Sequence, residues 1–297
     1  MRHLVVTLSN IGDLVMTTPV IEALHERFPG DAIDIVADRR SSALLEATPY
    51  LGTIYHRDKR AGFTEQLALL RRLRRQRYAT VVDLRTPFWP WLLRAGQRFV
   101  KPRRSKKTHA VEQHFEAVER LLPAHTAGPQ RLYLDPSATA AAAQKLAALP
   151  GSHWLALAPG ANWPGKRWPV VRYEALANHL ANDFDGLIVL GSQDDIERPF
   201  NSAEINLPVV DLSGHTSLPE VAAVLAQAGA FVGNDSGIGH IASAMQCPCL
   251  TVFGPGDPPR YRPWGDNATI IEAPNADLAR LEVDDVAAAL TRLLAQD

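Results

Sequence analysis

Short apolar runs alternate with segments of helical period along the whole 297-residue chain. Strands separated by helices usually pair in parallel, so this alternation predicts an α/β fold whose sheets are covered on both faces. The runs expected as strands are residues 3–8, 32–37, 79–84, 131–134, 153–158, 186–190, 209–212, 230–233 and 249–253. The segments expected as helices are residues 14–28, 64–75, 111–122, 170–182, 195–203, 219–227, 236–245 and 283–294.

Charge is divided unequally between the two halves of the chain. Residues 1–145 hold 23 Lys and Arg against 14 Asp and Glu, whereas the rest of the chain holds 8 against 18. An alanine-rich segment over residues 135–150 is expected to be a helix that leads into a linker. We therefore expect two doubly wound, Rossmann-like domains, 1–148 and 149–297, facing each other across a cleft, with ligands beyond the carboxyl ends of the strands.

The basic half suits an anionic ligand, and because no nucleic-acid-binding motif accompanies its charge, nucleic acid is not an expected partner. No window is apolar for long enough to span a membrane, and the N-terminus has no signal-cleavage pattern, so the chain is expected to be cytoplasmic. Cys247 and Cys249 are separated only by Pro248, which disfavours a disulfide, and two thiols make a poor zinc site. We expect two small buried side chains here and no metal site.

The first polar loop, residues 8–14, directly follows the first expected strand. Gly12 permits a tight turn, and Asp13 would then lie near the start of the next helix. Asp13 is either a helix-capping carboxylate or a general base at the edge of the sheet. The loop has neither the Walker A lysine nor the glycine spacing of a dinucleotide site, which argues against a kinase or a dehydrogenase.

A second polar loop, residues 158–169, follows a strand in the other half. It contains two glycines and several prolines, and it carries Lys166 and Arg167. These cations are either a solvated basic pair over a tryptophan or groups that neutralise a diphosphate leaving group.

The third polar loop lies within residues 231–240. A helix that begins near Ser236 would direct its free N–H groups at a phosphate, and His240 would lie one turn further on. Asp235 cannot assist a phosphate and is better suited to sugar hydroxyls. For His240 the alternative is a hydrogen-bonded structural histidine.

Four further segments are rigid or basic. Residues 253–265 form a long loop with several prolines, which is either a ligand contact or a structural turn. The basic runs at 57–60 and 101–107 are expected as loops that either bind an anionic acceptor or are solvated. The run at 71–77 is expected on a helix, as a solvated face.

Taken together, these loops resemble glycosyltransferase family nine, the ADP-heptose:lipopolysaccharide heptosyltransferases. The resemblance covers nearly the whole chain and is strongest in S-N-I-G-D-L-V-M-T-T-P at 9–19, in 159–169, and in N-D-S-G-I-G-H and F-G-P-G-D-P within 232–265. It implies the two-domain GT-B fold, with the acceptor on the N-terminal domain and the nucleotide sugar on the C-terminal domain. It also implies inverting transfer without a metal or other cofactor.

The resemblance also implies roles for individual residues. Asp13 matches the proposed catalytic aspartate, which would deprotonate the acceptor hydroxyl, and Lys166 matches a lysine that contacts the donor phosphates. The other implied donor-binding residues are Asp235 on the sugar, Ser236, Gly237 and His240 on the phosphate side, and Asp195 near the ribose. For the acceptor we predict Ser9, Asn10, Arg57, Arg60, Arg103 and Arg104.

Three positions depart from the family pattern: Asn10 and Gly239 stand where relatives often carry serine, and Ser236 replaces a frequent threonine. The first two changes bear on the choice of acceptor or donor, whereas Ser236 keeps the hydroxyl. The expected partners are an ADP-heptose-like nucleotide sugar and an anionic lipopolysaccharide core acceptor, with the enzyme peripheral to the inner membrane. The alternatives are a transferase for another nucleotide sugar, a nucleotide-sugar epimerase, and a glycan-binding protein without turnover.

Overall fold

The computed structural model describes residues 1–58, 62–123 and 125–296. The chain forms two compact units, Met1–Tyr133 (unit 1) and Leu134–Asp297 (unit 2). The boundary expected from the sequence, near residue 148, lies further along the chain than this division. The helix α6, Pro136–Leu146, belongs to unit 2, because Lys145 Nζ donates to the carbonyl of His215 at 2.6 Å and pairs with Glu220 at 3.4 Å.

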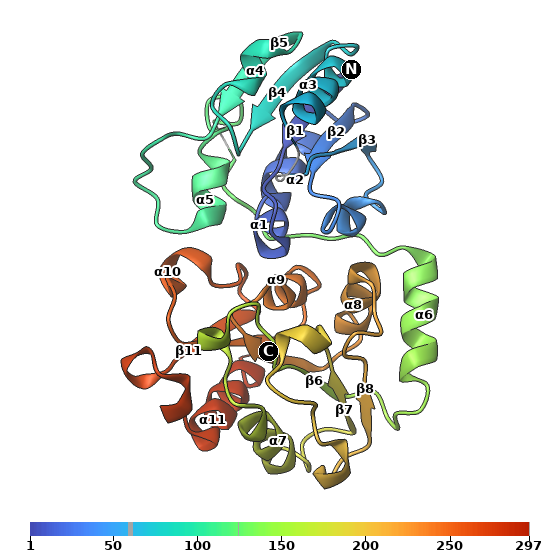
Figure 1. Cartoon of the computed structure of the whole chain (residues 1–297), viewed down its shortest axis with the longest axis vertical. Coiled ribbons are helices and arrows are strands. Elements are labelled where there is room, and N and C mark those ends of the chain that lie inside the picture. Colours follow the sequence, from blue (N-terminus) through green and yellow to red (C-terminus); the bar gives the residue numbers. More distant parts are fainter. Residues whose placement is uncertain (59–61, 124, 297) are drawn as a thin grey trace. The chain divides into compact units, whose positions relative to one another are not determined.

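Unit 1 contains a five-stranded sheet in the order β3-β2-β1-β4-β5, and every neighbouring pair is parallel (Figure 1). The strands are β1 Arg2–Val6, β2 Ala32–Ala37, β3 Leu51–His56, β4 Tyr78–Asp83 and β5 Ala95–Val100. The helices are α1 Ile11–Val15, α2 Thr18–Arg27, η1 Ser42–Leu45, α3 Phe63–Leu73, α4 Trp89–Leu92 and α5 Ala110–Phe115.

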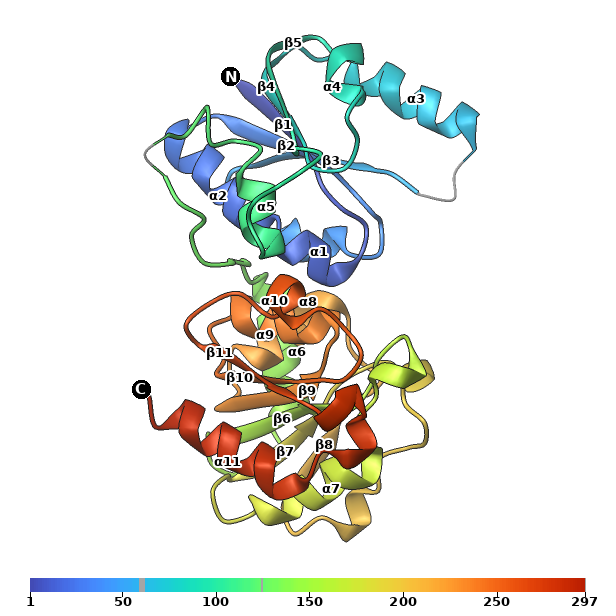
Figure 2. The ribbon, with the colours of Figure 1, turned by 90° about the vertical axis from the view of Figure 1, so that its left-hand side faces the viewer.

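The sheet of unit 1 is covered on both faces, as the sequence predicts. Figure 2 shows α1, α2 and α5 on one side of the sheet and α3 and α4 on the other. Leu69 and Leu73 of α3 belong to a core cluster that includes Leu4 and Val6 of β1. Burial of these side chains at helical spacing on α3, against strand residues two apart, is what holds α3 on the sheet.

Unit 2 contains a six-stranded sheet in the order β11-β10-β9-β6-β7-β8, again parallel throughout. The strands are β6 Trp154–Ala158, β7 Gly186–Val189, β8 Val209–Asp211, β9 Ala230–Asn234, β10 Cys249–Phe253 and β11 Ala268–Glu272. Besides α6, the helices are η2 Pro164–Lys166, α7 Val170–His179, η3 Gln193–Asp195, η4 Ser202–Glu204, α8 Leu218–Leu225, α9 Gly237–Ala244, α10 Pro258–Tyr261, η5 Pro274–Ala276, η6 Leu278–Arg280 and α11 Val283–Leu294.

Several expected elements are wrong. The helix expected over 14–28 is two helices, because the hydroxyls of Thr17 and Thr18 bond to the carbonyls of Leu14 and Val15 where α1 ends. The strand expected over 131–134 pairs with no strand of the described chain. The helix expected over 111–122 is α-helical only to Phe115.

The helix expected over 195–203 is also absent from the structure. The segment is bonded to α7 instead: the Glu174 side chain accepts from the N–H of Asn201 at 2.8 Å, and the Glu197 side chain accepts from the N–H of Val170 at 3.1 Å. The short turns η3 and η4 stand in its place.

Each sheet has one point at which the strand order reverses. In unit 1 the chain runs outward from β1 through β2 to β3, then returns to β4 beside β1. In unit 2 the same reversal lies between β6 and β9. Polar loops that follow these two pairs of strands therefore meet where ligands of doubly wound sheets bind.

Candidate active site

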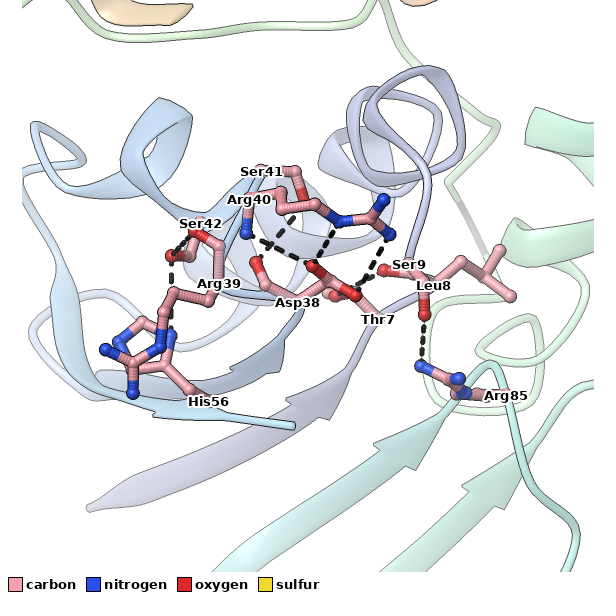
Figure 3. Close-up of polar contacts among 10 residues, drawn as sticks. All are labelled: Thr7, Leu8, Ser9, Asp38, Arg39, Arg40, Ser41, Ser42, His56 and Arg85. Carbon is pink, nitrogen blue, oxygen red and sulfur yellow. Dashed lines mark hydrogen bonds and ion pairs between the residues drawn. The ribbon is translucent and has the colours of Figure 1, made fainter. Parts of the chain in front are cut away.

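In unit 1, the loops after β1 and β4 are joined by one side-chain contact across the reversal point. Arg85 Nη1 donates to Ser9 Oγ (Figure 3). Asp83 at the end of β4 fixes the backbone at Arg85, because it accepts from the N–H of Arg85 at 2.9 Å and from the N–H of Thr86 at 2.7 Å. Arg85 is thus a candidate site residue that the sequence motifs do not identify.

Asp83 lies at the centre of this edge. Its side chain is 1% exposed, and burial raises its pKa although the bonds from Thr86 and Arg85 oppose the shift. The carboxylate stabilises the turn after β4 and thereby orients Arg85.

Asp13 lies in the first turn of α1 and Asn10 is the N-cap residue. The Asn10 side chain does not cap the helix; its Nδ2 donates to Asp13 Oδ2 at 2.8 Å. The structure therefore gives the cap position to Asn10, and it gives Asp13 an amide that orients its carboxylate. The helix dipole favours a negative charge in the first turn, so the ionised Asp13 also stabilises α1.

Arg57, at the end of β3, is the predicted acceptor residue with the most distinctive surroundings. Its guanidinium lies 4.3 Å from the centroid of the Trp89 ring. Nε and Nη1 are buried and have no hydrogen-bond partner within the described chain. Burial, and then repulsion by Arg85, lowers the pKa of Arg57. Two buried donors of this half-buried cation thus have no partner among the described residues, which suits an anionic ligand.

The neighbouring loop after β2 is held by its own side chains. Arg40 Nε donates to Asp38 Oδ1 at 3.0 Å, and this contact raises the pKa of Arg40. Ser42 Oγ lies 3.4 Å from His56 Nδ1, and Figure 3 shows the two side chains pointing toward each other. Of the predicted basic residues, Arg103 and Arg104 are exposed on the loop after β5. Arg60 lies outside the described residues.

In unit 2, the reversal point holds an ion pair between the loops that follow β6 and β9. Lys166 Nζ contacts Asp235 Oδ2, and both side chains are more than two-thirds buried. Arg167 is held by its Nε, which donates to the carbonyl of Ala161 at 2.7 Å. The two cations are therefore built into the site, and the alternative of a solvated basic pair is wrong.

Asn234, the last residue of β9, connects the two loops. Its side chain is fully buried, and its Oδ1 accepts from the N–H of Trp168 at 2.9 Å and from the hydroxyl of Tyr173 at 3.0 Å. Its Nδ2 donates to the carbonyl of Pro159 at 2.7 Å. This asparagine fixes the backbone on both sides of Lys166, and the sequence analysis read it only as part of a motif.

The start of α9 lies immediately after the ion pair. Ser236 is the N-cap residue with extended backbone, and Gly237 is the first helical residue. Ser236 Oγ is buried and has no hydrogen-bond partner in the part of the chain that the structure describes. The hydroxyl and the first N–H groups of α9 therefore stay available to an anion. His240, one turn further on, is buried.

Two further loops of unit 2 approach this point. The carbonyl of Asp195 accepts from the N–H of Ala161 at 3.0 Å, which brings Asp195 to the loop after β6. A Cβ on Gly256 would lie 3.4 Å from Asp235 Oδ2, so the proline-containing loop after β10 also reaches the site. Both loops therefore lie at the edge of the sheet that carries Lys166 and Asp235.

Gly239 has a packing explanation. A Cβ there would lie 3.1 Å from Thr251 Oγ1 and 3.5 Å from Pro263. The absence of a side chain at this position lets α9 approach β10 closely. A serine at this position would require these neighbours to shift.

The two cysteines are buried, free thiols, and burial raises the pKa of both, that of Cys249 to about 12. They are structural side chains, as expected. No group of three or more His, Cys, Asp or Glu side chains placed to hold a metal ion occurs among the described residues.

Comparison with known proteins places this architecture in a family. The sequence model of glycosyltransferase family 9 (heptosyltransferase) matches residues 91–289. The chain is 26% identical to lipopolysaccharide heptosyltransferase 3 of Escherichia coli (strain K12) over 338 residues, which cover 96% of each protein.

Solved structures show the same two-domain fold of GT-B type. A family 9 glycosyl transferase from Veillonella parvula superposes with a TM-score of 0.87 at 20% identity, over 100% of this chain and 97% of that one. The E. coli ADP-heptose lps heptosyltransferase II superposes with a TM-score of 0.80 at 22% identity, over 100% and 99%. The chain belongs to glycosyltransferase family 9, the heptosyltransferase family, and is a glycosyltransferase.

Proposed function

We propose that this enzyme transfers a heptose from ADP-heptose to a sugar of the lipopolysaccharide core, with inversion at the anomeric carbon and without a metal ion. The observation that carries the proposal is the Lys166–Asp235 pair beside the free N-terminus of α9 in a chain of this family. Relatives of this chain are named lipopolysaccharide heptosyltransferases.

The donor phosphates are assigned to unit 2. The Lys166 ammonium, the first N–H groups of α9 and Ser236 Oγ are all donors at one edge. Departure of ADP leaves negative charge on its terminal phosphate, which these donors stabilise in place of a metal ion. On donor binding, the Lys166 ammonium is shared between Asp235 and the phosphate, and Asp235 turns its other oxygen to sugar hydroxyls.

The acceptor is assigned to unit 1. The acceptor hydroxyl oxygen bonds to the anomeric carbon while the bond from that carbon to the phosphate oxygen breaks. Asp13 takes the proton that the hydroxyl loses. A single displacement of this kind inverts the configuration. Asn10 Nδ2 donates to Asp13 Oδ2, and this bond orients the carboxylate for its role as base.

The anionic groups of a core acceptor fit the cations of unit 1. Arg57 carries two buried donors without a partner in the described structure, and Arg85 lies near it. Exposed Arg103 and Arg104 add charge further out, and Arg60, from the sequence, extends the set. Ser9, which accepts a hydrogen bond from Arg85, lies in the loop that leads into α1, the helix that carries Asp13.

The test is an assay of purified enzyme with ADP-heptose and a deacylated core acceptor, with ADP release and the anomeric configuration of the product as readouts, with and without EDTA. We expect acceptor-dependent ADP release, an inverted product and no effect of EDTA. Free ADP or an altered sugar without acceptor would indicate hydrolysis or epimerisation instead. Transfer from a different nucleotide sugar alone would keep the reaction class and change the donor.

A further inference from the structure

Large apolar side chains are exposed together on α4 of unit 1. Phe88, Trp91 and Leu92 are 67%, 59% and 45% exposed, and we call these three residues the α4 patch. They are spaced three and four residues apart, so they occupy one face of a helical turn. Exposed side chains of this size, side by side, mark a surface that meets an apolar partner.

The opposite face of the same turn is firmly anchored. Leu93 is 4% exposed and, with the partly buried Trp89, packs on the core cluster beneath α3. Arg98 of the edge strand β5 donates to the carbonyl of Pro90 at 2.9 Å and to that of Leu93 at 3.2 Å. These contacts hold α4 on the core of unit 1, so the fold itself keeps the side chains of the α4 patch exposed.

The surroundings of the α4 patch are strongly cationic. Residues 57–107 contain 16 Lys and Arg against 3 Asp and Glu, and one of these acids, Asp83, is buried. Helix α3 lies beside α4 in both ribbon views (Figures 1 and 2). Its C-terminal end and the following turn present five exposed cations, Arg71, Arg72, Arg74, Arg75 and Arg77.

We propose that the α4 patch inserts into the surface of an anionic phospholipid bilayer, with the surrounding arginines on the lipid phosphates. Apolar and aromatic tips that enter the headgroup boundary, ringed by Lys and Arg, are the combination that binds such surfaces. Tryptophan favours this boundary because its ring is apolar while its N–H stays hydrated. Charge complementarity selects an anionic lipid, and Leu92, which has no ring to stack on a base, suits an apolar phase better than a single-stranded nucleic acid.

This inference deepens the proposed function and rests on it for the lipid-carried acceptor. No helix of the described residues is long and apolar enough to cross a membrane. Surface insertion through α4 is a different mode of attachment: it would hold unit 1, which carries the proposed acceptor residues, against the bilayer in which a lipopolysaccharide acceptor is anchored.

The binding test is co-sedimentation of the full chain with phosphatidylcholine vesicles that contain or lack phosphatidylglycerol. We expect binding to the anionic vesicles to be stronger by about tenfold or more, and to weaken with salt. The double variant Phe88→Ser/Trp91→Ser should lose about tenfold or more in vesicle affinity. Val171→Ser, at a 57% exposed valine of α7, is the matched control and should bind normally.

Insertion is distinguished from adsorption by lipids brominated on their acyl chains, which quench tryptophan that reaches them. Trp91→Phe should lose most of this quenching while it keeps most of its binding. Unchanged quenching in Trp91→Phe, unchanged binding of the double variant, or tight binding to single-stranded RNA with none to vesicles would each overturn the proposal.

Activity separates this inference from the proposed function. With a water-soluble deacylated acceptor, the double variant should transfer heptose as well as the wild type. With the acceptor carried in vesicles, its rate should fall about tenfold or more. A wild type that binds vesicles but transfers to neither acceptor would sink the proposed function and leave the membrane surface standing. Equal rates of both proteins on vesicles would overturn the membrane surface alone.

Discussion

The two reversal points are built on the same sheet topology but are filled differently. In unit 2 the polar groups are largely bonded to one another: Lys166 pairs with Asp235, and Asn234 makes three hydrogen bonds that fix the loops on either side. In unit 1 the polar edge carries surplus cations, of which Arg57 is half-buried with two free donors among the described residues.

This difference follows from what each edge is proposed to bind. A donor that presents the same diphosphate in every turnover needs one arrangement of protein donors, and an arrangement that is already formed lowers the cost of binding it. An acceptor glycan is larger and carries anionic groups at several places. Cations with unused donors favour such a partner without fixing one arrangement.

The largest expected effect is on Asp13, the one group of unit 1 assigned to the chemical step. Asp13→Asn keeps the size and the hydrogen bond to Asn10 but removes the base, so kcat should fall by about 10²–10⁴-fold with little change in either KM. Steady-state kinetics with both substrates measures this. Asn10→Ala, which removes only the orienting amide, is the companion variant and should lose far less. Equal losses would mean that Asp13 acts only through the loop.

The next effect tests the rigidity of unit 2. Asn234→Ala leaves the N–H of Trp168, the hydroxyl of Tyr173 and the carbonyl of Pro159 without their partner in a fully buried place. The free energy of unfolding should fall by about 3 kcal/mol. Denaturant unfolding measures it. Tyr173→Phe removes one of these bonds and should cost about 1 kcal/mol.

If Asn234→Ala unfolds like the wild type, the contrast between the two edges fails at its stronger end. If it is destabilised yet binds the donor normally, the network serves folding alone. Rigidity for donor binding requires that the donor Kd of Asn234→Ala also rises, measured at a temperature where the variant is folded.

A smaller effect tests the surplus charge of unit 1. Arg57→Ala should lower kcat/KM for the acceptor about tenfold, which corresponds to roughly 1.4 kcal/mol, without a change in donor KM. The loss should shrink as salt is added, because screening weakens the interaction in the wild type. Arg280→Ala makes the same change of charge in unit 2, at an exposed pair with Asp277, and should leave the acceptor kinetics unchanged.

The sequence alone predicts most of the architecture. For the candidate site, it predicts the loops that local sequence patterns mark, but not the contacts between distant residues. Parallel α/β units, and a common edge for Lys166 and Asp235, follow from strand-loop-helix order. The edge strands β3, β5 and β11 were missed because half-exposed strands lack a continuous apolar run. Arg85 and Asn234 were missed for a different reason: their roles depend on bonds to residues 61 to 76 positions away, which no local spacing reveals.

The smallest expected effect concerns Asp83, which directs Arg85. Burial raises the pKa of Asp83 in the folded protein, so the folded state holds this proton more tightly than the unfolded chain does. The contribution of Asp83 to stability should therefore be greatest below the ordinary aspartate pKa, and it should be lost as the pH rises through the raised folded pKa. Asp83→Asn keeps an oxygen that can accept from Arg85 and Thr86 but cannot titrate.

The free energy of unfolding of wild type minus that of Asp83→Asn should thus decrease as the pH rises from about 4 toward neutrality. Denaturant unfolding of the two proteins across this range measures it. A difference that increases with pH would mean that the bonds from Thr86 and Arg85 outweigh burial. Asp83 would then be a charged group whose hydrogen bonds are made within its own unit, like Asp235 in unit 2. Its negative charge would also offset part of the positive charge at the edge of unit 1.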